Sequence, residues 1–179
     1  VLEETRVDPA AMEELQDVMS CVMCGLCDEG CTVIAVDKNF LGPAALTKAY
    51  RAVRDPRDTQ QAQRLSLVDK DHGIWDCTHC FEANGHCPKG INPTNRIFTM
   101  HDMLIRHGIK NKGVKRHHDS FVSSVRSSGW LDEGRIAIDS LGWTNLIGLI
   151  RFIPTAFRAL RRGKAPIPYV HHKRPGAGH

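Results

Sequence analysis

The sequence predicts an all-α fold, and three observations lead to that prediction. No segment alternates apolar and polar residues over the length of a half-buried strand. Several segments instead combine helix start or stop signals with apolar residues at helical spacing. All seven cysteines lie in two short runs, residues 21–31 and 77–87, with the spacing of metal-binding loops. We therefore expect helices that hold and cover two cysteine loops.

The first predicted helix begins at Asp8-Pro9, where an N-cap residue precedes a first-turn proline. Met12, Leu15 and Met19 then share one face, which we expect to cover the first cysteine run.

Three further helices, one of them short, are expected in the region that ends at Gly108. One runs from Gly42-Pro43 to Asp55-Pro56, and the polar segment 57–64 forms a short helix after it. Asn92-Pro93 repeats the cap-and-proline signal. The apolar stripe that follows, before Gly108 ends the helix, consists of Ile97, Met100, Leu104 and Ile105.

We divide the chain into a helical domain that contains both cysteine runs (1–112), a helical docking extension (113–162) and an extended basic tail (163–179). Two short helices, 119–128 and 132–141, are expected in the extension. Residues 143–160 are amphipathic and broken by Pro154. No acid follows Asp139, so this basic end either lies on anionic lipid, binds an acidic partner or packs on its own domain.

The first cysteine run reads C-x2-C-x2-C-x3-C, from Cys21 through Cys24 and Cys27 to Cys31. In bacterial ferredoxins this run binds cubane iron–sulfur clusters, with three thiolates on one cluster and the fourth on the other. Structural zinc is the main rival, because C-x2-C pairs also bind zinc, but one zinc ion has no use for the extra cysteine. A disulfide framework is disfavoured by the odd number of cysteines.

The second run closes in Cys87-Pro88, as ferredoxin runs do, but has Ala83 where the full motif has cysteine. By the crosswise rule, the first cluster is a 4Fe–4S cluster whose ligands are Cys21, Cys24, Cys27 and Cys87. The second cluster has only three ligands, which are Cys31, Cys77 and Cys80. It is therefore either a 3Fe–4S cluster or a 4Fe–4S cluster with an open or non-cysteine fourth site. Candidates for that fourth site are His79, Glu82, Asn84 and His86.

Longer motifs carry a resemblance to a known family. The segments 40–46, 49–51, 57–58 and 87–94, which include Phe40-Leu41-Gly42-Pro43 and Cys87-Pro88-Lys89-Gly90, resemble the C-terminal helical ferredoxin domain of succinate dehydrogenase and fumarate reductase iron–sulfur subunits. The resemblance covers about residues 8–107 and implies an electron relay between a flavin subunit and a further acceptor. The N-terminal 2Fe–2S domain of that family is not found in this chain.

As a stand-alone chain, the sequence resembles the small heterodisulfide reductase subunit that carries the same helical two-cluster domain and a basic, proline-containing tail. Thr32 stands where succinate dehydrogenase has proline, and Cys80 has replaced a ligand at position 83. We therefore expect an electron-transfer subunit of a heterodisulfide-reductase-like complex, with a flavin or cysteine-rich catalytic partner. The alternatives are a succinate:quinone oxidoreductase or fumarate reductase subunit and an enzyme that uses an open iron as a Lewis acid. No catalytic residue is assigned.

Composition and charge exclude several classes. The net charge of +4 is too weakly basic to indicate nucleic-acid binding. No stretch of uncharged apolar residues is long enough for a membrane-spanning helix. The acidic start of the chain is unlike a signal peptide, and reduced thiols predict a cytoplasmic protein, either free or peripheral on the inner face of the membrane through 143–162.

Overall fold

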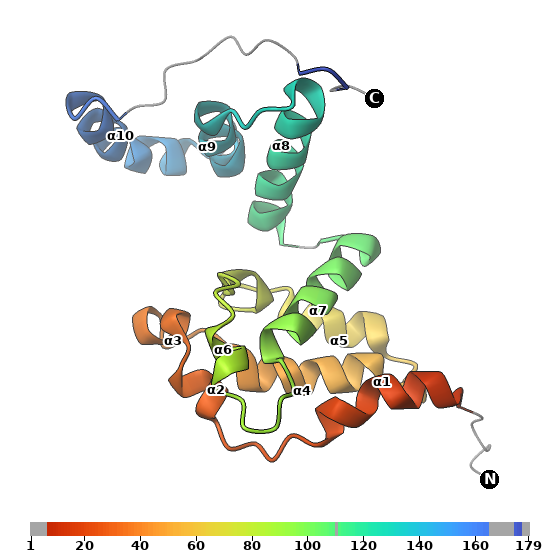
Figure 1. Cartoon of the computed structure of the whole chain (residues 1–179). Coiled ribbons are helices and arrows are strands. Elements are labelled where there is room, and N and C mark those ends of the chain that lie inside the picture. Colours follow the sequence, from red (N-terminus) through yellow and green to blue (C-terminus); the bar gives the residue numbers. More distant parts are fainter. Residues whose placement is uncertain (1–6, 110, 165–173, 177–179) are drawn as a thin grey trace. The chain divides into compact units, whose positions relative to one another are not determined.

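The computed structural model describes residues 7–109, 111–164 and 174–176. These residues form α-helices and one short 3-10 helix and contain no strand, which confirms the predicted all-α fold (Figure 1). The chain divides into two compact units, residues 1–110 and 111–179. The first residues, on which the expectation about a signal peptide depends, lie outside the described part.

The first unit contains both cysteine runs. Its elements are α1 (Pro9–Met19), α2 (Leu26–Glu29), α3 (Thr32–Val36), α4 (Gly42–Arg54), α5 (Gln61–Val68), the 3-10 helix η1 (Ile74–Asp76), α6 (Glu82–Gly85) and α7 (Pro93–His107). The start of α1 is as predicted, because the Asp8 side chain accepts a hydrogen bond from the Ala10 N–H at 3.2 Å. The ends of α4 at Asp55 and of α7 at Gly108 are also as predicted.

Helix α4 lies at the centre of the first unit and contacts α1, α5 and α7. Its apolar face is buried at Leu46, Tyr50 and Val53. The Tyr50 hydroxyl donates a hydrogen bond to the Glu14 carboxylate on α1 at 2.7 Å, and Arg54 forms an ion pair with the same carboxylate. The core around α4 consists of Val18, Phe40, Leu46, Tyr50, Val53, Leu65, Val68, Ile74, Ile91, Ile97, Met100 and Leu104.

Three details of the predicted helices are wrong. The buried face of α1 carries Leu15 and Val18, whereas Met19 is 48% exposed, because α1 packs on α4 through the former pair. The short polar helix lies later than expected, at Gln61–Val68, where Leu65 and Val68 reach the core. Ile105 is 42% exposed and does not belong to the buried stripe of α7.

The cap of α7 also differs from the prediction. Asn92 has a left-handed backbone, with φ of 55°, and its side chain makes no capping hydrogen bond. The Asn84 side chain instead accepts a hydrogen bond from the Thr94 N–H at 2.8 Å and donates one to the side-chain oxygen of Asn95 at 2.9 Å. A residue of the second cysteine run therefore caps α7 and fixes the run to this helix.

The second unit contains α8 (Lys112–Ser128), α9 (Glu133–Leu141) and α10 (Leu146–Arg161). Helix α8 begins seven residues before the predicted start at 119, because the Asn111 side chain caps it through the N–H groups of Gly113 and Val114. The predicted break at Pro154 is wrong, since α10 continues through this residue. Proline removes only one donor from a helix, and the turns on either side remain hydrogen-bonded.

The tail is described only in part. Arg174 donates its backbone N–H to the Ser128 carbonyl at 3.0 Å, and its guanidinium lies 4.0 Å from the centre of the Trp130 ring. Residues 165–173 and 177–179 of the predicted extended tail, including Pro166 and Pro168, lie outside the described residues. In the part of the chain that is described, no helix combines the length and the hydropathy needed to cross a membrane.

Candidate metal centres

The first cysteine run folds as a loop that ends in a single helical turn. Cys21 follows the end of α1, and the backbone then turns through two left-handed residues, Met23 with φ of 57° and Gly25 with φ of 76°. Helix α2 begins directly after Gly25 and contains Cys27. Gly25 adopts its positive φ without strain because glycine has no Cβ atom.

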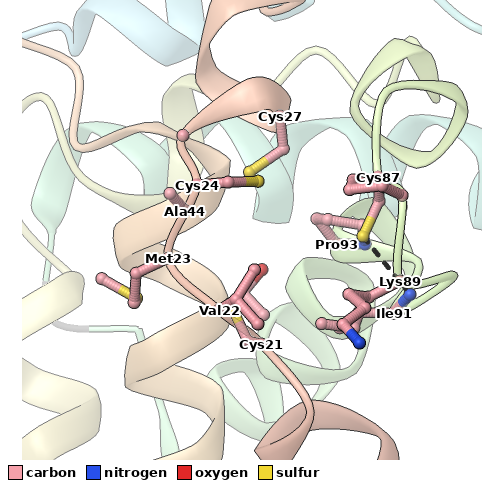
Figure 2. A pocket seen from close by; sticks show the side chains of 13 residues that line it. Cys21, Val22, Met23, Cys24, Cys27, Ala44, Cys87, Lys89, Ile91 and Pro93 are labelled. Atoms are coloured by element: carbon pink, nitrogen blue, oxygen red, sulfur yellow. Dashed lines mark hydrogen bonds between the residues drawn. The ribbon is translucent and has the colours of Figure 1, made fainter.

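Four cysteines line one cavity between this loop and the second run. They are Cys21, Cys24, Cys27 and Cys87, and the space that they border measures about 400 Å³ including its open mouth. Figure 2 shows Cys24 and Cys27 on one side of this space and Cys87 on the other. These are the four residues that the crosswise rule groups together.

The surroundings of this cavity suit a group bound by thiolates. The Ile91 N–H points to the Cys87 sulfur at 3.4 Å, and the Lys48 ammonium donates to the Cys21 carbonyl at 3.4 Å. Burial, with the neighbouring Asp28 carboxylate, raises the pKa of the Cys27 thiol to about 11. This thiol is therefore protonated at neutral pH unless a metal ion displaces the proton.

A second cavity, of about 320 Å³ with its mouth, is lined by Cys31, Cys77 and Cys80. Cys31 precedes α3 and Cys77 follows η1, so two segments far apart in the sequence supply these thiols. The Thr32 hydroxyl points to the Cys80 sulfur at 3.9 Å. Burial raises the pKa of the Cys77 thiol, as it does for Cys27.

Ala83 lies buried in the wall of the second cavity. The side chains proposed as a fourth ligand are not among the residues that line it. Asn84 caps α7, and a ring nitrogen of His86 lies 2.9 Å from the Glu82 carbonyl. His79 bonds to another histidine, so the structure gives three of these four side chains other partners.

The histidine pair beside the second cavity was not predicted. Nε2 of His79 lies 2.9 Å from Nδ1 of His101, and Nε2 of His101 lies 3.0 Å from the Ile74 carbonyl oxygen. A carbonyl oxygen can only accept a hydrogen bond, so in neutral His101 the Nε2 atom carries the ring hydrogen and donates it to Ile74. The unprotonated Nδ1 of His101 then accepts a hydrogen bond from Nε2–H of His79. The His79 ring stacks on Phe98, with ring centroids 4.1 Å apart, and the His101 ring stacks on Trp75, with centroids 4.7 Å apart. This chain of bonds links the Cys77–Cys80 loop to α7.

We expect the folding stability of the protein to depend on pH through the protonation of His101. Burial lowers its pKa in the folded protein to about 4, whereas the unfolded side chain titrates near about 6.5. The unfolded chain therefore binds the extra proton first, and stability present above about pH 6.5 is lost as the pH falls toward 4. Urea denaturation should show a steeper loss of stability between neutral pH and pH 5 for the wild type than for His101→Gln. Equal slopes would contradict this role.

The two cysteine runs meet each other and share their supporting helices. Helix α2 contacts α6 and α4. A Cβ atom at Gly30 would lie 2.4 Å from the His86 ring, so this glycine is needed for the close approach of the runs rather than for its φ. Adjacent residues at the start of α4, Pro43 and Ala44, line different cavities, which places the cavities side by side.

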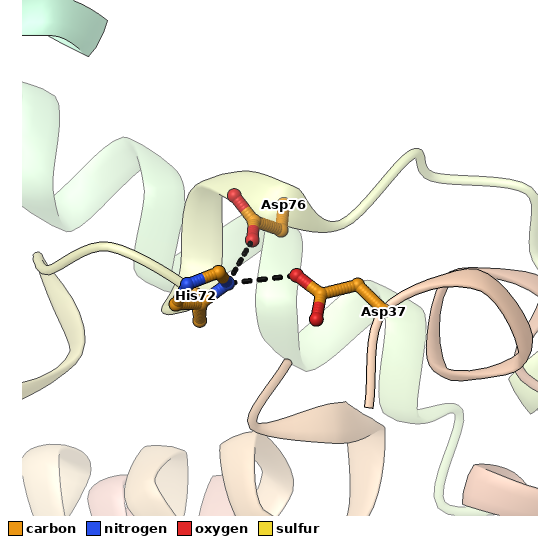
Figure 3. Close-up of side chains that lie close together, drawn as sticks. All are labelled: Asp37, His72 and Asp76. Atoms are coloured by element: carbon orange, nitrogen blue, oxygen red, sulfur yellow. Dashed lines mark hydrogen bonds and ion pairs between the residues drawn. The ribbon is translucent and has the colours of Figure 1, made fainter. Parts of the chain in front are cut away.

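A third cluster of polar side chains lies near the second cavity. His72 Nδ1 lies 2.7 Å from an Asp37 oxygen and 3.7 Å from an Asp76 oxygen (Figure 3). Their ligand-type atoms lie within 4.8 Å of one another, as in a divalent-metal site. All three side chains are accessible to solvent. His72 pairs with both carboxylates, which ties the end of α3 to the segment before Cys77.

Comparison with known families identifies the class of this site. Residues 17–91 match the model of the 4Fe-4S dicluster domain. This segment contains both cysteine runs. This helical segment therefore matches a 4Fe–4S dicluster domain, and the match supports iron–sulfur clusters as its cofactors.

The same region is similar to iron–sulfur subunits of two related complexes. The fumarate reductase iron-sulfur subunit of Haemophilus influenzae is 38% identical over 93 residues, which are 52% of this chain and 36% of that protein. The corresponding subunit of Mycobacterium tuberculosis is 35% identical over 107 residues, or 60% and 43% of the two chains. The succinate dehydrogenase iron-sulfur subunit of Paracoccus denitrificans is 32% identical over 94 residues, or 52% and 36%. These matches confirm the resemblance to this family, and the chain spans less than half the length of these relatives.

Proposed function

We propose that the two cavities hold two iron–sulfur clusters. The ligands of the first, a 4Fe–4S cluster, are Cys21, Cys24, Cys27 and Cys87. Those of the second are Cys31, Cys77 and Cys80, and this cluster is either 3Fe–4S or 4Fe–4S with a fourth iron that no cysteine binds. The proposal is supported by the two separate groups of cysteines that line the two cavities. Each cluster supplies a site that gains or loses one electron.

Substituting Ala83 tests the composition of the second cluster. Ala83→Cys introduces a thiol into the wall that already carries three cysteines. We expect this variant to bind a 4Fe–4S cluster with four thiolates, so that any 3Fe–4S signal in the EPR spectrum of the oxidised wild type disappears. Ala83→Ser is the matched control, since it adds a side chain of similar size without a thiol. If the wild type shows a 3Fe–4S signal and Ala83→Cys retains it, Ala83 does not face the cluster.

We further propose that the chain transfers electrons within an oxidoreductase complex of the succinate dehydrogenase and fumarate reductase type, next to a flavin subunit. The observation that carries this proposal is the adjacency of the two cavities. Cys27 lines one and Cys31 the other. Four residues of chain span at most about 14 Å, so ligands of the two clusters lie within electron-transfer reach.

The other two candidate functions have less support. The relatives in Haemophilus influenzae, Mycobacterium tuberculosis and Paracoccus denitrificans are subunits of fumarate reductase and succinate dehydrogenase, so they favour this alternative over the heterodisulfide-reductase-like complex. An enzyme with an open Lewis-acid iron needs acid–base groups beside the substrate. The second cavity is lined by apolar side chains, threonines and cysteines, and none of His79, Glu82 and His86 is among them.

A redox titration of the purified chain, followed by EPR, tests the proposal. We expect two reversible one-electron steps and no change in either signal when hydroxy acids or thiols are added. When the flavin subunit from the same organism is added with succinate, at least the cluster of higher potential should become reduced. If both clusters stay oxidised in this mixture, the assignment to this complex is contradicted. A second-cluster signal that shifts with a hydroxy acid alone would favour the enzyme.

A further inference from the structure

Helix α10 and a tryptophan shortly before it expose a large apolar surface. The seven large apolar side chains concerned are each between 58% and 73% exposed, namely Trp143, Leu146, Ile147, Ile150, Ile153, Phe157 and Leu160. No residue of α10 is buried. Soluble monomers rarely expose a contiguous apolar patch of this kind, and such patches mark sites of protein or membrane contact.

The side chains of α10 fall into three sectors around its axis. At the angular step of an α-helix, Leu146, Ile150, Ile153, Phe157 and Leu160 share an arc of about 80°. Arg151, Arg158 and Arg161 follow on one flank of this arc, and Ile147 lies on the same flank at the start of the helix. The remaining sector carries the half-buried Phe152 and Ala156, and α10 contacts α9 within this unit. The exposed surface of α10 thus presents an apolar stripe beside a basic one.

The charge of this segment indicates an anionic partner. No acidic residue follows Asp139, while α10 and the residues directly after it carry five basic side chains, which are Arg151, Arg158, Arg161, Arg162 and Lys164. None of them forms an ion pair with a carboxylate of the described residues. The apolar stripe is therefore accompanied by uncompensated positive charge.

We propose that α10 binds in the plane of an anionic lipid bilayer, with its apolar stripe among the acyl chains and its arginines at the lipid phosphates. The helix extends about 24 Å, and its exposed apolar side chains are spread along its whole length rather than gathered around one anchor. A flat, extended, apolar and basic surface complements a bilayer, which offers negative charge and hydrocarbon along the same plane. Trp143 lies at the start of this surface, and tryptophan favours the boundary between water and lipid. This inference does not depend on the proposed redox function.

Vesicle binding by the full chain with its clusters tests the proposal. We expect co-sedimentation with vesicles of phosphatidylcholine and phosphatidylglycerol, and much weaker binding to phosphatidylcholine alone. Raising the salt concentration should weaken the binding, because the arginine contribution is screened. Equal binding to both vesicle types, or no binding to either, would overturn the proposal.

Two sets of variants assign the binding to α10. Combining Ile150→Gln with Phe157→Gln should lower the partition coefficient by at least about tenfold, since two apolar side chains no longer enter the lipid. Thr155→Gln, an exposed position off the apolar stripe, is the matched control and should bind as the wild type does. Arg151→Gln with Arg158→Gln should reduce binding to the anionic vesicles only. If the glutamine pair on the apolar stripe binds like the wild type, α10 is not the lipid-binding surface.

Tryptophan fluorescence gives an independent readout. The emission should shift to shorter wavelength when anionic vesicles are added, and Trp143→Phe should abolish the shift. Size-exclusion chromatography without lipid tests the competing occupant, which is a second copy of the chain. If the wild type is a dimer and the variant with Ile150→Gln and Phe157→Gln is a monomer, the apolar stripe of α10 is a homodimer interface and the bilayer proposal is wrong.

Discussion

Replacing Cys87 with alanine is expected to remove the four-thiolate 4Fe–4S cluster from the first cavity while the second cluster is retained. Cys87 is the one cysteine of the second run that lines the first cavity, together with three cysteines from the first run. Its loss leaves three thiolates and removes the Ile91 N–H bond to sulfur. The purified variant should contain less iron than the wild type, because three thiolates in the first cavity hold at most a 3Fe–4S core, and its EPR spectrum should lack the signal of the four-thiolate cluster.

Cys80→Ala is the matched control for this experiment. Cys80 lines the second cavity, so this variant should lose the second signal and retain the first. The EPR signals that the two variants retain should together account for the wild-type spectrum. If Cys87→Ala instead removes the signal that Cys80→Ala also removes, the cysteines are not sorted between two clusters as we propose.

Replacing Tyr50 with alanine is expected to produce the largest loss of stability in the first unit. Tyr50 is fully buried at the centre of the core, and its hydroxyl bonds to Glu14. Removing a large buried aromatic side chain costs about 3–5 kcal/mol through lost burial and the cavity that remains. Anaerobic urea denaturation should show a lower midpoint, by far-UV circular dichroism and by the visible absorbance of the clusters.

Tyr50→Phe separates the hydrogen bond from the packing. It retains the ring and removes only the hydroxyl, and Glu14 keeps its ion pair with Arg54. We expect a loss of about 1 kcal/mol, the usual contribution of one hydrogen bond. A Tyr50→Ala variant as stable as Tyr50→Phe would show that this side chain does not hold α4 in the core.

Helix boundaries that depend on local chemistry could be predicted from the sequence. Asp8 caps α1, and the proline after Asp55 ends α4, because cap and proline effects act within a few residues. The cap of α7 could not be predicted in the same way. Asn92 stands where a cap is expected, but Asn84, ten residues before Thr94, provides the hydrogen bond. Such a partner is determined by tertiary packing.

In the candidate site, too, some features could be predicted from the sequence and others depend on tertiary packing. The cysteine spacing alone predicts that Cys87 belongs with Cys21 and Cys31 with Cys77, and our proposed ligand sets use this spacing together with the residues that line the two cavities. The bond between His79 and His101 joins residues that are 22 positions apart, and no local pattern indicates it. Sequence proximity makes His79 a candidate for the fourth ligand, but this ring faces another histidine.

Counting iron and acid-labile sulfide in the anaerobically purified wild type, with EPR in the oxidised and reduced states, tests the two-cluster assignment most directly. Two clusters require about seven or eight iron atoms and about eight sulfides per chain, and two distinct paramagnetic signals. One or two metal ions without sulfide would mean that the cysteines bind zinc or another single ion, and the proposed electron-transfer function would be wrong.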